Sequence, residues 1–385
     1  MTTENRDRRL PAVQALRGIA ASLVVFHHFA RLLQDGGRNP SWINASGLGN
    51  LGMCGVDIFF VISGFIMVYT TRGKAGADDA KIFITRRFLR IYPLYWVWTS
   101  LLLVLWVVGF AQQRFHYSAL YLVKSYLLIP SFNGLNFQPL MRQGWTLSFE
   151  MLFYLIFSLG ILLKLRSRKL LFLVLAFSTL ALLGRLFAPD GGARHLLTDP
   201  IVMEFLYGVL AAEILMRLPA IGNSRLARSL PIVLMSLGAI ALLSTVKVHD
   251  ADSMRFAFYG VPAFCIVFGG AMWGSAYAPS LLIYLGDCSY SIYLVHFFFS
   301  LAYASTLKHI PSLNRLPSDA VIVLAGTITI AVSSLTYFLV ELPLTKALAP
   351  RGAKKIVAPA PAKPNSPMES LGTIPVVMNR PEYRQ

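Results

Sequence analysis

Long apolar runs separated by short polar segments dominate the sequence from residue 11 to residue 343. Because a helix needs about 20 mostly apolar residues to cross a bilayer, each run that meets or approaches this length predicts a membrane span. These runs cover residues 11–33, 50–71, 93–110, 144–163, 170–187, 200–216, 230–246, 257–275, 281–306 and 320–343. The pattern predicts an all-α fold, a polytopic membrane helical bundle of about ten transmembrane helices.

Two further segments are interpreted differently. The run 117–130 is shorter, carries Lys124 and ends in Pro130, so we expect an interfacial or re-entrant piece of a long loop. The amino terminus has the basic start of a signal peptide, but no small-x-small cleavage site follows the first apolar run. We therefore expect that run to remain as the first span.

Composition supports a membrane protein and excludes several other classes. Hydrophobic residues make up 56% of the chain and charged residues only 14%, against about 25% charged residues in soluble domains. A soluble fold could not hide this much apolar surface, and the composition also excludes disorder, collagen and a disulfide scaffold. The net charge of +17 is spread between the apolar runs, so no nucleic-acid partner is expected. The three cysteines lack metal-ligand spacing, and no metal site is predicted.

The distribution of Lys and Arg sets the expected orientation. With the amino terminus in the cytoplasm, the cytoplasmic segments hold far more Lys and Arg than the external ones. The positive-inside rule therefore predicts that both termini are cytoplasmic. We expect one transmembrane domain over residues 1–345. Residues 346–385 are basic and rich in Pro and Ala, which predicts a disordered cytoplasmic tail.

Arg17 and His28 lie in the first span, eleven positions apart. Eleven steps along a helix leave an angular offset of about 20° and an axial separation of about 16 Å, so both side chains lie on one face. An ionisable group inside a bilayer is costly unless it is paired or faces water, which marks both residues as functional candidates. His27 points about 100° away, and we interpret it as structural.

The second span contains Asp57, which needs a cation or a hydrogen-bond donor, and a histidine is a natural partner. A purely structural role for Asp57 is the alternative. Gly55, Ser63 and Gly64 in the same span would let a neighbouring helix approach closely.

Arginines precede the third span. Arg87 and Arg90 are three apart, hence on one face if the stretch is helical, and Arg86 adjoins them. Guanidinium groups bind phosphates in bidentate fashion, so this set is a candidate anion clamp. Ordinary positive-inside anchoring is the alternative.

Polar residues also mark two later spans. Glu150 opens the fourth span together with Trp145 and Ser148, and a solvated charge at the rim is the alternative to a functional role. Tyr293 and His296 are i, i+3 neighbours in the ninth span. A hydrogen bond that holds helices together explains this pair as well as chemistry does.

Five motifs together resemble the acyltransferase family 3 membrane enzymes of bacteria. They are LRGIAASLVVFHHF, with the R-x10-H spacing from Arg17 that selects His28, GVDIFFVISGF, RRFLRIYPLYW, WTLSFEMLFY and SYSIYLVH. They stand in the family's order over nearly all of the chain except the tail. The resemblance implies a multi-pass protein of the bacterial inner membrane. Its expected reaction moves an acyl group, usually acetyl, from cytoplasmic acyl-CoA to a hydroxyl of an exported or envelope glycan.

The resemblance also implies roles for individual residues. Catalytic roles are expected for His28, as general base, and for Asp57 and Glu150. Donor-binding roles are expected for Arg17, Arg86, Arg87 and Arg90. Carbohydrate-binding roles are expected for Ser63, Trp145, Ser148, Tyr293 and His296. An acyl-histidine intermediate remains an alternative mechanism.

The expected partners are acyl-CoA, in the form of acetyl-CoA or another acyl-CoA, a carbohydrate acceptor and the lipid bilayer. No permanently bound cofactor is expected, and homo-oligomerisation is left open. A secondary transporter or a lipid-linked glycan flippase is the alternative function. Such folds often contain inverted repeats, whereas the Arg–His pair occurs once in this sequence.

Overall fold

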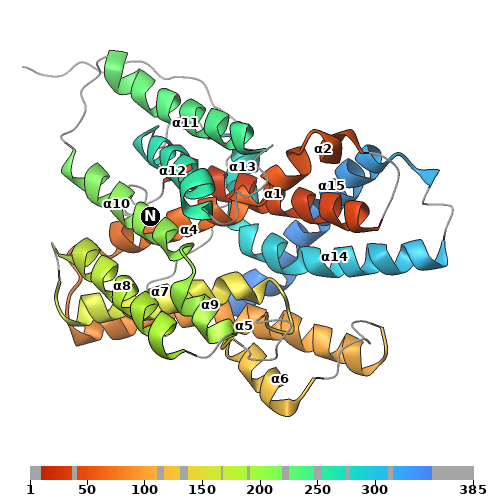
Figure 1. Cartoon of the computed structure of the whole chain (residues 1–385), viewed down its shortest axis with the longest axis horizontal. Coiled ribbons are helices and arrows are strands. Elements are labelled where there is room, and N and C mark those ends of the chain that lie inside the picture. The colour runs from red at the N-terminus through yellow and green to blue at the C-terminus, as the bar shows by residue number, and fades with distance from the viewer. Residues whose placement is uncertain are drawn as a thin grey trace, which may run out of the picture. The chain divides into compact units, whose positions relative to one another are not determined.

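The computed structural model describes a helical chain (Figure 1). The described residues are 10–36, 41–110, 117–130, 138–165, 168–188, 191–218, 225–246, 254–273, 278–310 and 315–348. The helices are α1 (Pro11–Asp35), α2 (Trp42–Ala45), α3 (Leu48–Leu51), α4 (Cys54–Thr70), α5 (Ala77–Val107), α6 (Ala119–Tyr126), α7 (Gly144–Leu162), α8 (Lys169–Phe187), α9 (Gly192–Thr198), α10 (Val202–Arg217), α11 (Arg225–Thr245), η2 (Phe256–Gly260), α12 (Val261–Trp273), α13 (Ser280–Asp287), α14 (Ser289–His309), α15 (Ser318–Thr336), η4 (Tyr337–Glu341) and α16 (Leu342–Ala347). No strand occurs in the described ranges.

Each of the ten apolar runs is helical over most of its described residues, which confirms the all-α membrane bundle. Among the described residues, seven helices are long and apolar enough to cross a membrane. The pair α13 and α14, bent by 71°, would add an eighth span if it crosses as one unit. The other two predicted spans correspond to α10 and to the shorter apolar stretch of α11. The cytoplasmic placement of the termini stays a prediction, and the tail beyond residue 348 lies outside the described residues.

The third span begins earlier than its apolar run. Helix α5 starts at Ala77, so the arginine-bearing stretch before Pro93 belongs to the same helix as the apolar run. Asp78 and Asp79 in its first turn are favourable at the positive end of the helix dipole. The run 117–130 contains the short helix α6, and Tyr95 of α5 donates a 2.7 Å hydrogen bond to the Ser125 carbonyl at its end.

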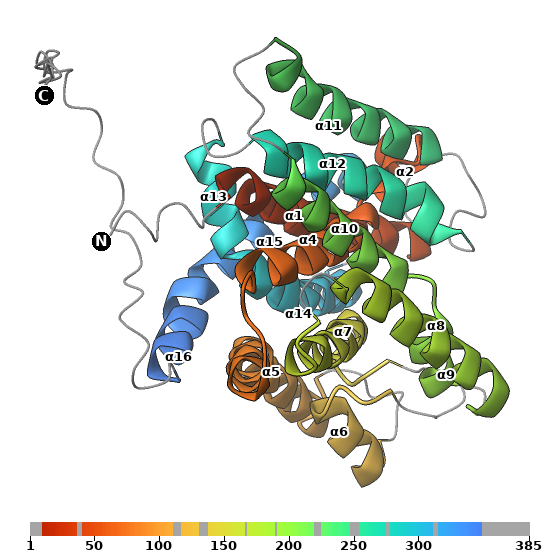
Figure 2. The ribbon, with the colours of Figure 1, turned by 90° about the vertical axis from the view of Figure 1, so that its left-hand side faces the viewer.

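Helices α1 and α4 lie between the α11–α12 pair and the α5–α7 pair in both views (Figures 1 and 2). α1 packs against α4, α12, α13, α14 and α15, while α4 packs most extensively against α10. The close approach predicted for α4 is confirmed. A Cβ atom on Gly55 would collide with the Ala20 carbonyl of α1, and one on Gly64 would collide with the Phe205 carbonyl of α10. These contacts place α4 at the centre, where its residues line two different cavities.

Helix α8 is peripheral, and its large apolar side chains are exposed. Leu171, Leu175 and Phe187 are 58%, 57% and 76% exposed, respectively. A helix with this surface is suited to contact with lipid.

Candidate active site

The first of two cavities, which we name the arginine cavity, has a volume of about 90 Å³. Its lining includes Arg17 of α1, Arg87 and Arg90 of α5, and Glu150 and Tyr154 of α7. The structure therefore brings together three of the four arginines that the sequence grouped as donor-binding. They come from two helices that are far apart in the chain, and Glu150 is the carboxylate among the lining residues.

The three arginines differ in their surroundings. Arg17 donates a 3.1 Å hydrogen bond from Nη2 to Ser289 Oγ at the start of α14. Arg87 is half-buried, and its guanidinium carbon lies 5.6 Å from the Tyr154 ring centroid. Its Nε is buried without a hydrogen-bond partner among the described residues. Arg90 is exposed although it lines the cavity. Together they offer guanidinium groups at several depths.

Arg86 does not belong to this set. It is exposed and does not line the arginine cavity. Because α5 is helical here, Arg87 and Arg90 share a face, and Arg86 is rotated by about 100° from its neighbour Arg87. The structure therefore offers no contact for the predicted donor-binding role of Arg86.

Glu150 lies on the wall of the arginine cavity, where it accepts hydrogen bonds from two hydroxyl groups. Ser63 of α4 donates at 3.1 Å, and the hydroxyl of Tyr154 donates one helical turn away. Glu150 and Ser63 do not line the second cavity, which contains His28. Glu150, for which we expected a catalytic role, therefore lies among the arginines and not beside His28, and Ser63 is its hydrogen-bond partner.

The second cavity, which we name the histidine cavity, has a volume of about 470 Å³. Its lining includes His27 and His28 of α1, Gln143 and Trp145 at the start of α7, and Arg255 next to η2. Trp145 is the one predicted carbohydrate-binding residue that lines this cavity alone. An indole ring beside polar and basic side chains suits a carbohydrate better than it suits an apolar ligand.

His28 is oriented by its own helix. Its Nδ1 lies 2.8 Å from the Val24 carbonyl oxygen. A carbonyl can only accept, so in the neutral ring Nδ1 carries the proton and Nε2 keeps a lone pair. This is the tautomer that a general base requires. The His28 ring also packs against His296, with 4.8 Å between the ring centroids.

His27 lines the same cavity as His28. Its Nδ1 lies 2.7 Å from the Gly49 carbonyl in α3, which ties α1 to the α2–α3 segment. This contact agrees with the structural interpretation of His27. The R-x10-H spacing and the packing against His296 favour His28 as the reacting residue.

His296 is fully buried and lines neither cavity. Its Nδ1 lies 3.2 Å from the Ile292 carbonyl, and its Nε2 lies 3.4 Å from the side-chain nitrogen of Gln143. Both ring nitrogens are thus engaged by protein groups. His296 supports the His28 ring from behind, and this place differs from the predicted contact with carbohydrate.

Ser148 is also buried away from both cavities. Its hydroxyl donates a 2.7 Å hydrogen bond to the Leu128 carbonyl, which fastens α7 to the segment after α6. A predicted role in carbohydrate binding is therefore not matched by its position.

Tyr293 of α14 lines both cavities, and Val56 of α4 is the other residue that they share. The Tyr293 hydroxyl lies 2.7 Å from Thr146 Oγ1 and donates to the Gln143 carbonyl at 3.2 Å. The two cavities therefore meet at this ring. They extend from it toward opposite ends of α1, because Arg17 lines one cavity and His28 the other.

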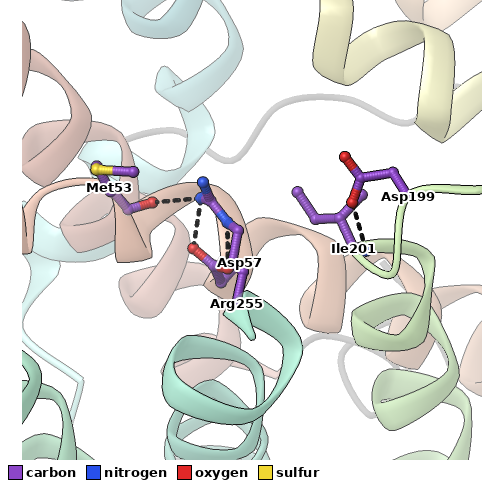
Figure 3. Close-up of polar contacts among 5 residues, drawn as sticks. All are labelled: Met53, Asp57, Asp199, Ile201 and Arg255. Carbon is purple, nitrogen blue, oxygen red and sulfur yellow. Dashed lines mark hydrogen bonds and ion pairs between the residues drawn. The ribbon is translucent and has the colours of Figure 1, made fainter. Parts of the chain in front are cut away.

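Asp57 has a cation as its partner, as expected, but that cation is Arg255 and not a histidine (Figure 3). Arg255 binds both carboxylate oxygens, from Nε at 2.9 Å and from Nη2 at 2.8 Å, and Nη2 also donates to the Met53 carbonyl at 3.2 Å. Asp57 is fully buried. The pair is bidentate, which fixes the plane of a guanidinium that lines the histidine cavity.

Arg255 was not among the candidate residues predicted from the sequence. The signal available was the unpaired Asp57, since a buried carboxylate requires a cation from some other span. In the described part of the chain, no group of three or more His, Cys, Asp and Glu residues could hold a metal ion.

A family model described as an acyltransferase domain, of the acyltransferase 3 type, matches residues 10–338. The exopolysaccharide production protein ExoZ of Rhizobium meliloti (strain 1021) is 34% identical over 258 residues, which cover 64% of this chain and 76% of ExoZ. No solved structure matches the chain.

Two more distant relatives point to the same chemistry. YrhL of Bacillus subtilis (strain 168), provisionally named a peptidoglycan O-acetyltransferase, is 25% identical over 75% of this chain. The acyltransferase MdmB of Streptomyces mycarofaciens is 31% identical over 39% of this chain. The matched regions span 48% of YrhL and 39% of MdmB.

Proposed function

This chain belongs to the acyltransferase family 3 of membrane proteins, and from that premise we propose that it is an O-acyltransferase acting on an exported or envelope glycan. The acyl group is most simply acetyl, and acyl-CoA is the proposed donor. The name of ExoZ supports a polysaccharide acceptor, and that of YrhL supports O-acetylation. The observation that carries the proposal is the junction of an arginine-lined cavity with a histidine-lined cavity at Tyr293.

The arginine cavity is the proposed donor site. Acyl-CoA carries several phosphates, and guanidinium groups are the side chains best suited to bind them. Arg87 offers a buried Nε without a described partner, and Arg90 is exposed. A volume of about 90 Å³ is too small for the nucleotide, so its phosphates would bind at the exposed Arg90 while the acylated arm extends inward.

The histidine cavity is the proposed acceptor site. It is roomier, at about 470 Å³, and Gln143 and Trp145 line it beside His28. Amide and indole groups are suited to binding and stacking a sugar ring. Arg255, which also lines this cavity, is held in place by Asp57. In place of the predicted catalytic role, Asp57 would therefore position the Arg255 side chain.

The reaction follows from the tautomer of His28. Its Nε2 takes the proton from the acceptor hydroxyl as the hydroxyl oxygen bonds to the acyl carbon of the thioester. The carbon–sulfur bond then breaks, and His28 returns the proton to the departing sulfur. The products are an O-acyl sugar and the free thiol of CoA, and His28 is regenerated.

The proposed location is the inner membrane of a bacterium, with the arginine cavity open to the cytoplasm. Acyl-CoA is anionic and does not cross a bilayer, so its binding site has to face the compartment that contains it. The histidine cavity would then receive the glycan from the external side.

Sealed membrane vesicles test both the reaction and its direction. Acetyl-CoA labelled in the acetyl group should acylate vesicle carbohydrate only when it is supplied to the cytoplasmic face, with release of one thiol per acetyl transferred. Vesicles without the protein are the control. Movement of a glycan across the membrane with no cleavage of acetyl-CoA would favour the transporter alternative and contradict the proposal.

A further inference from the structure

We propose that the Tyr293 ring directs the acyl group to carbohydrate and away from water, by forming the wall between the donor and acceptor cavities. This inference rests on the proposed function. The two cavities share Tyr293 and Val56, and every other lining residue belongs to one cavity alone. A thioester held on one side and a hydroxyl held on the other therefore meet at this wall.

Contacts from two other helices, α4 and α7, hold the Tyr293 ring in place. The ring lies edge-on to Phe59 of α4, with 6.3 Å between their centroids. Its hydroxyl is held by Thr146 and by the Gln143 carbonyl at the start of α7. Tyr293 itself belongs to α14 and is 8% exposed. A side chain that is restrained at both its ring and its hydroxyl is suited to narrowing the opening between the two cavities.

Water is the competitor that such a wall must exclude. The histidine cavity is large enough for several water molecules, and it contains the base that would activate one of them. If water replaced the sugar hydroxyl, its oxygen would bond to the acyl carbon and the carbon–sulfur bond would break. The proton would pass through His28 to the sulfur, giving a free carboxylic acid and CoA thiol. Transfer to carbohydrate therefore requires that the acyl carbon stays covered until the acceptor is in place.

The test measures thiol release from acetyl-CoA by the purified full chain, with water as the sole acceptor. Tyr293→Ala joins the two cavities and should raise this hydrolysis by about tenfold or more, a factor typical of lost discrimination between acceptors. Tyr293→Phe keeps the ring and should stay within about threefold of the parent. Val56→Ala thins the same wall from α4 and should raise hydrolysis by a smaller factor.

Two controls isolate the wall. Phe297→Ala enlarges the histidine cavity alone and Ile66→Ala the arginine cavity alone, so neither should raise hydrolysis as Tyr293→Ala does. In the double variant His28→Ala, Tyr293→Ala, hydrolysis should fall to background. Retention of hydrolysis there would mean that the attacking water is not activated by His28 in the histidine cavity, and the assignment would be wrong.

Other outcomes separate this inference from the proposed function. Size-exclusion profile and acetyl-CoA binding establish that each variant is folded. If folded Tyr293→Ala and Val56→Ala both hydrolyse acetyl-CoA at the parent rate, the wall is wrong while the acyltransferase stands. If the parent neither binds acetyl-CoA nor acylates carbohydrate, the proposed function fails first.

Discussion

The two cavities that meet at Tyr293 share helices α1, α4, α7 and α14 but differ in size, in charge and in how their charged side chains are held. The arginine cavity is small. Glu150 lines it and Glu341 lies near Arg17 and Arg90, but within the described residues none of its three arginines forms a direct ion pair with a carboxylate. The histidine cavity has about five times its volume. There Arg31 pairs with Asp35 at 3.2 Å and Arg255 pairs with Asp57, so carboxylates already accompany two of its cations.

This difference distinguishes a site for anions from a site for neutral polar groups. Arginines in excess over carboxylates favour a ligand that brings negative charge, because an unbalanced buried cation is costly. Cations that carboxylates already balance act mainly as fixed hydrogen-bond donors. The comparison thus teaches that charge balance around an arginine, and not its presence in a cavity, indicates what it binds.

The largest expected effect concerns the base of the histidine cavity. His28→Ala should lower acyl transfer by about 10²- to 10⁴-fold, the usual contribution of a general base. His27→Ala is the matched control and should keep most of the activity, since its Nδ1 contact to Gly49 is structural. Mass spectrometry of the glycan from each variant measures the acetyl content. Loss of acetylation in the His27 variant alone would move the reacting residue by one position.

The second effect concerns the carboxylates that balance the histidine cavity. Asp57→Asn removes the fully buried carboxylate that Arg255 binds through two nitrogen atoms, and should lower the free energy of unfolding by about 3–5 kcal/mol. Asp35→Asn breaks the pair with Arg31, whose two side chains are 59% and 63% exposed. This change should alter the free energy of unfolding by less than about 0.5 kcal/mol. Thermal unfolding in detergent compares the two. Equal losses would show that burial of the Asp57 pair carries no energetic weight.

The third prediction concerns the excess charge of the arginine cavity. Arg87→Ala should weaken acyl-CoA binding by about thirtyfold or more, as expected when a buried charge partner of about 2–5 kcal/mol is lost. Arg87→Lys should recover part of this, because a point charge cannot reproduce the bidentate fork. Arg86→Ala, one position away and exposed, should bind like the parent. Direct binding assays on the purified variants decide between a clamp and simple membrane anchoring, for which all three would match the parent.

The smallest expected effect concerns the orientation of Glu150. Ser63→Ala removes one of two hydroxyl donors to the carboxylate while Tyr154 remains. The loss of one hydrogen bond of about 0.5–1.5 kcal/mol should weaken acyl-CoA binding by about two- to tenfold. Ser148→Ala, which lines neither cavity, should lower thermal stability and leave binding unchanged. If Ser148→Ala weakened acyl-CoA binding as much as Ser63→Ala, the Ser63 hydrogen bond to Glu150 would have no specific role in binding.

The sequence by itself determined the positions of the membrane helices, the shared face of Arg87 and Arg90, and the family. Each of these depends on local periodicity or spacing: a run of apolar residues specifies a helix in lipid, and 3.6 residues per turn fix which side chains share its face. The start of α5 at Ala77 also has a local cause, since acidic residues in the first turn favour a helix start there. The apolar pattern alone did not predict this start.

Only the tertiary structure decided which polar residues face one another. Arg255 is 198 positions from Asp57, and no local pattern connects them. The same holds for the division of Glu150 and His28 between two cavities, and for the burial of Ser148 and His296 behind them. The physical reason is that a buried polar group is satisfied by whichever helix the packing brings beside it. Helix order and close contacts such as Gly64 against Phe205 fix that neighbour.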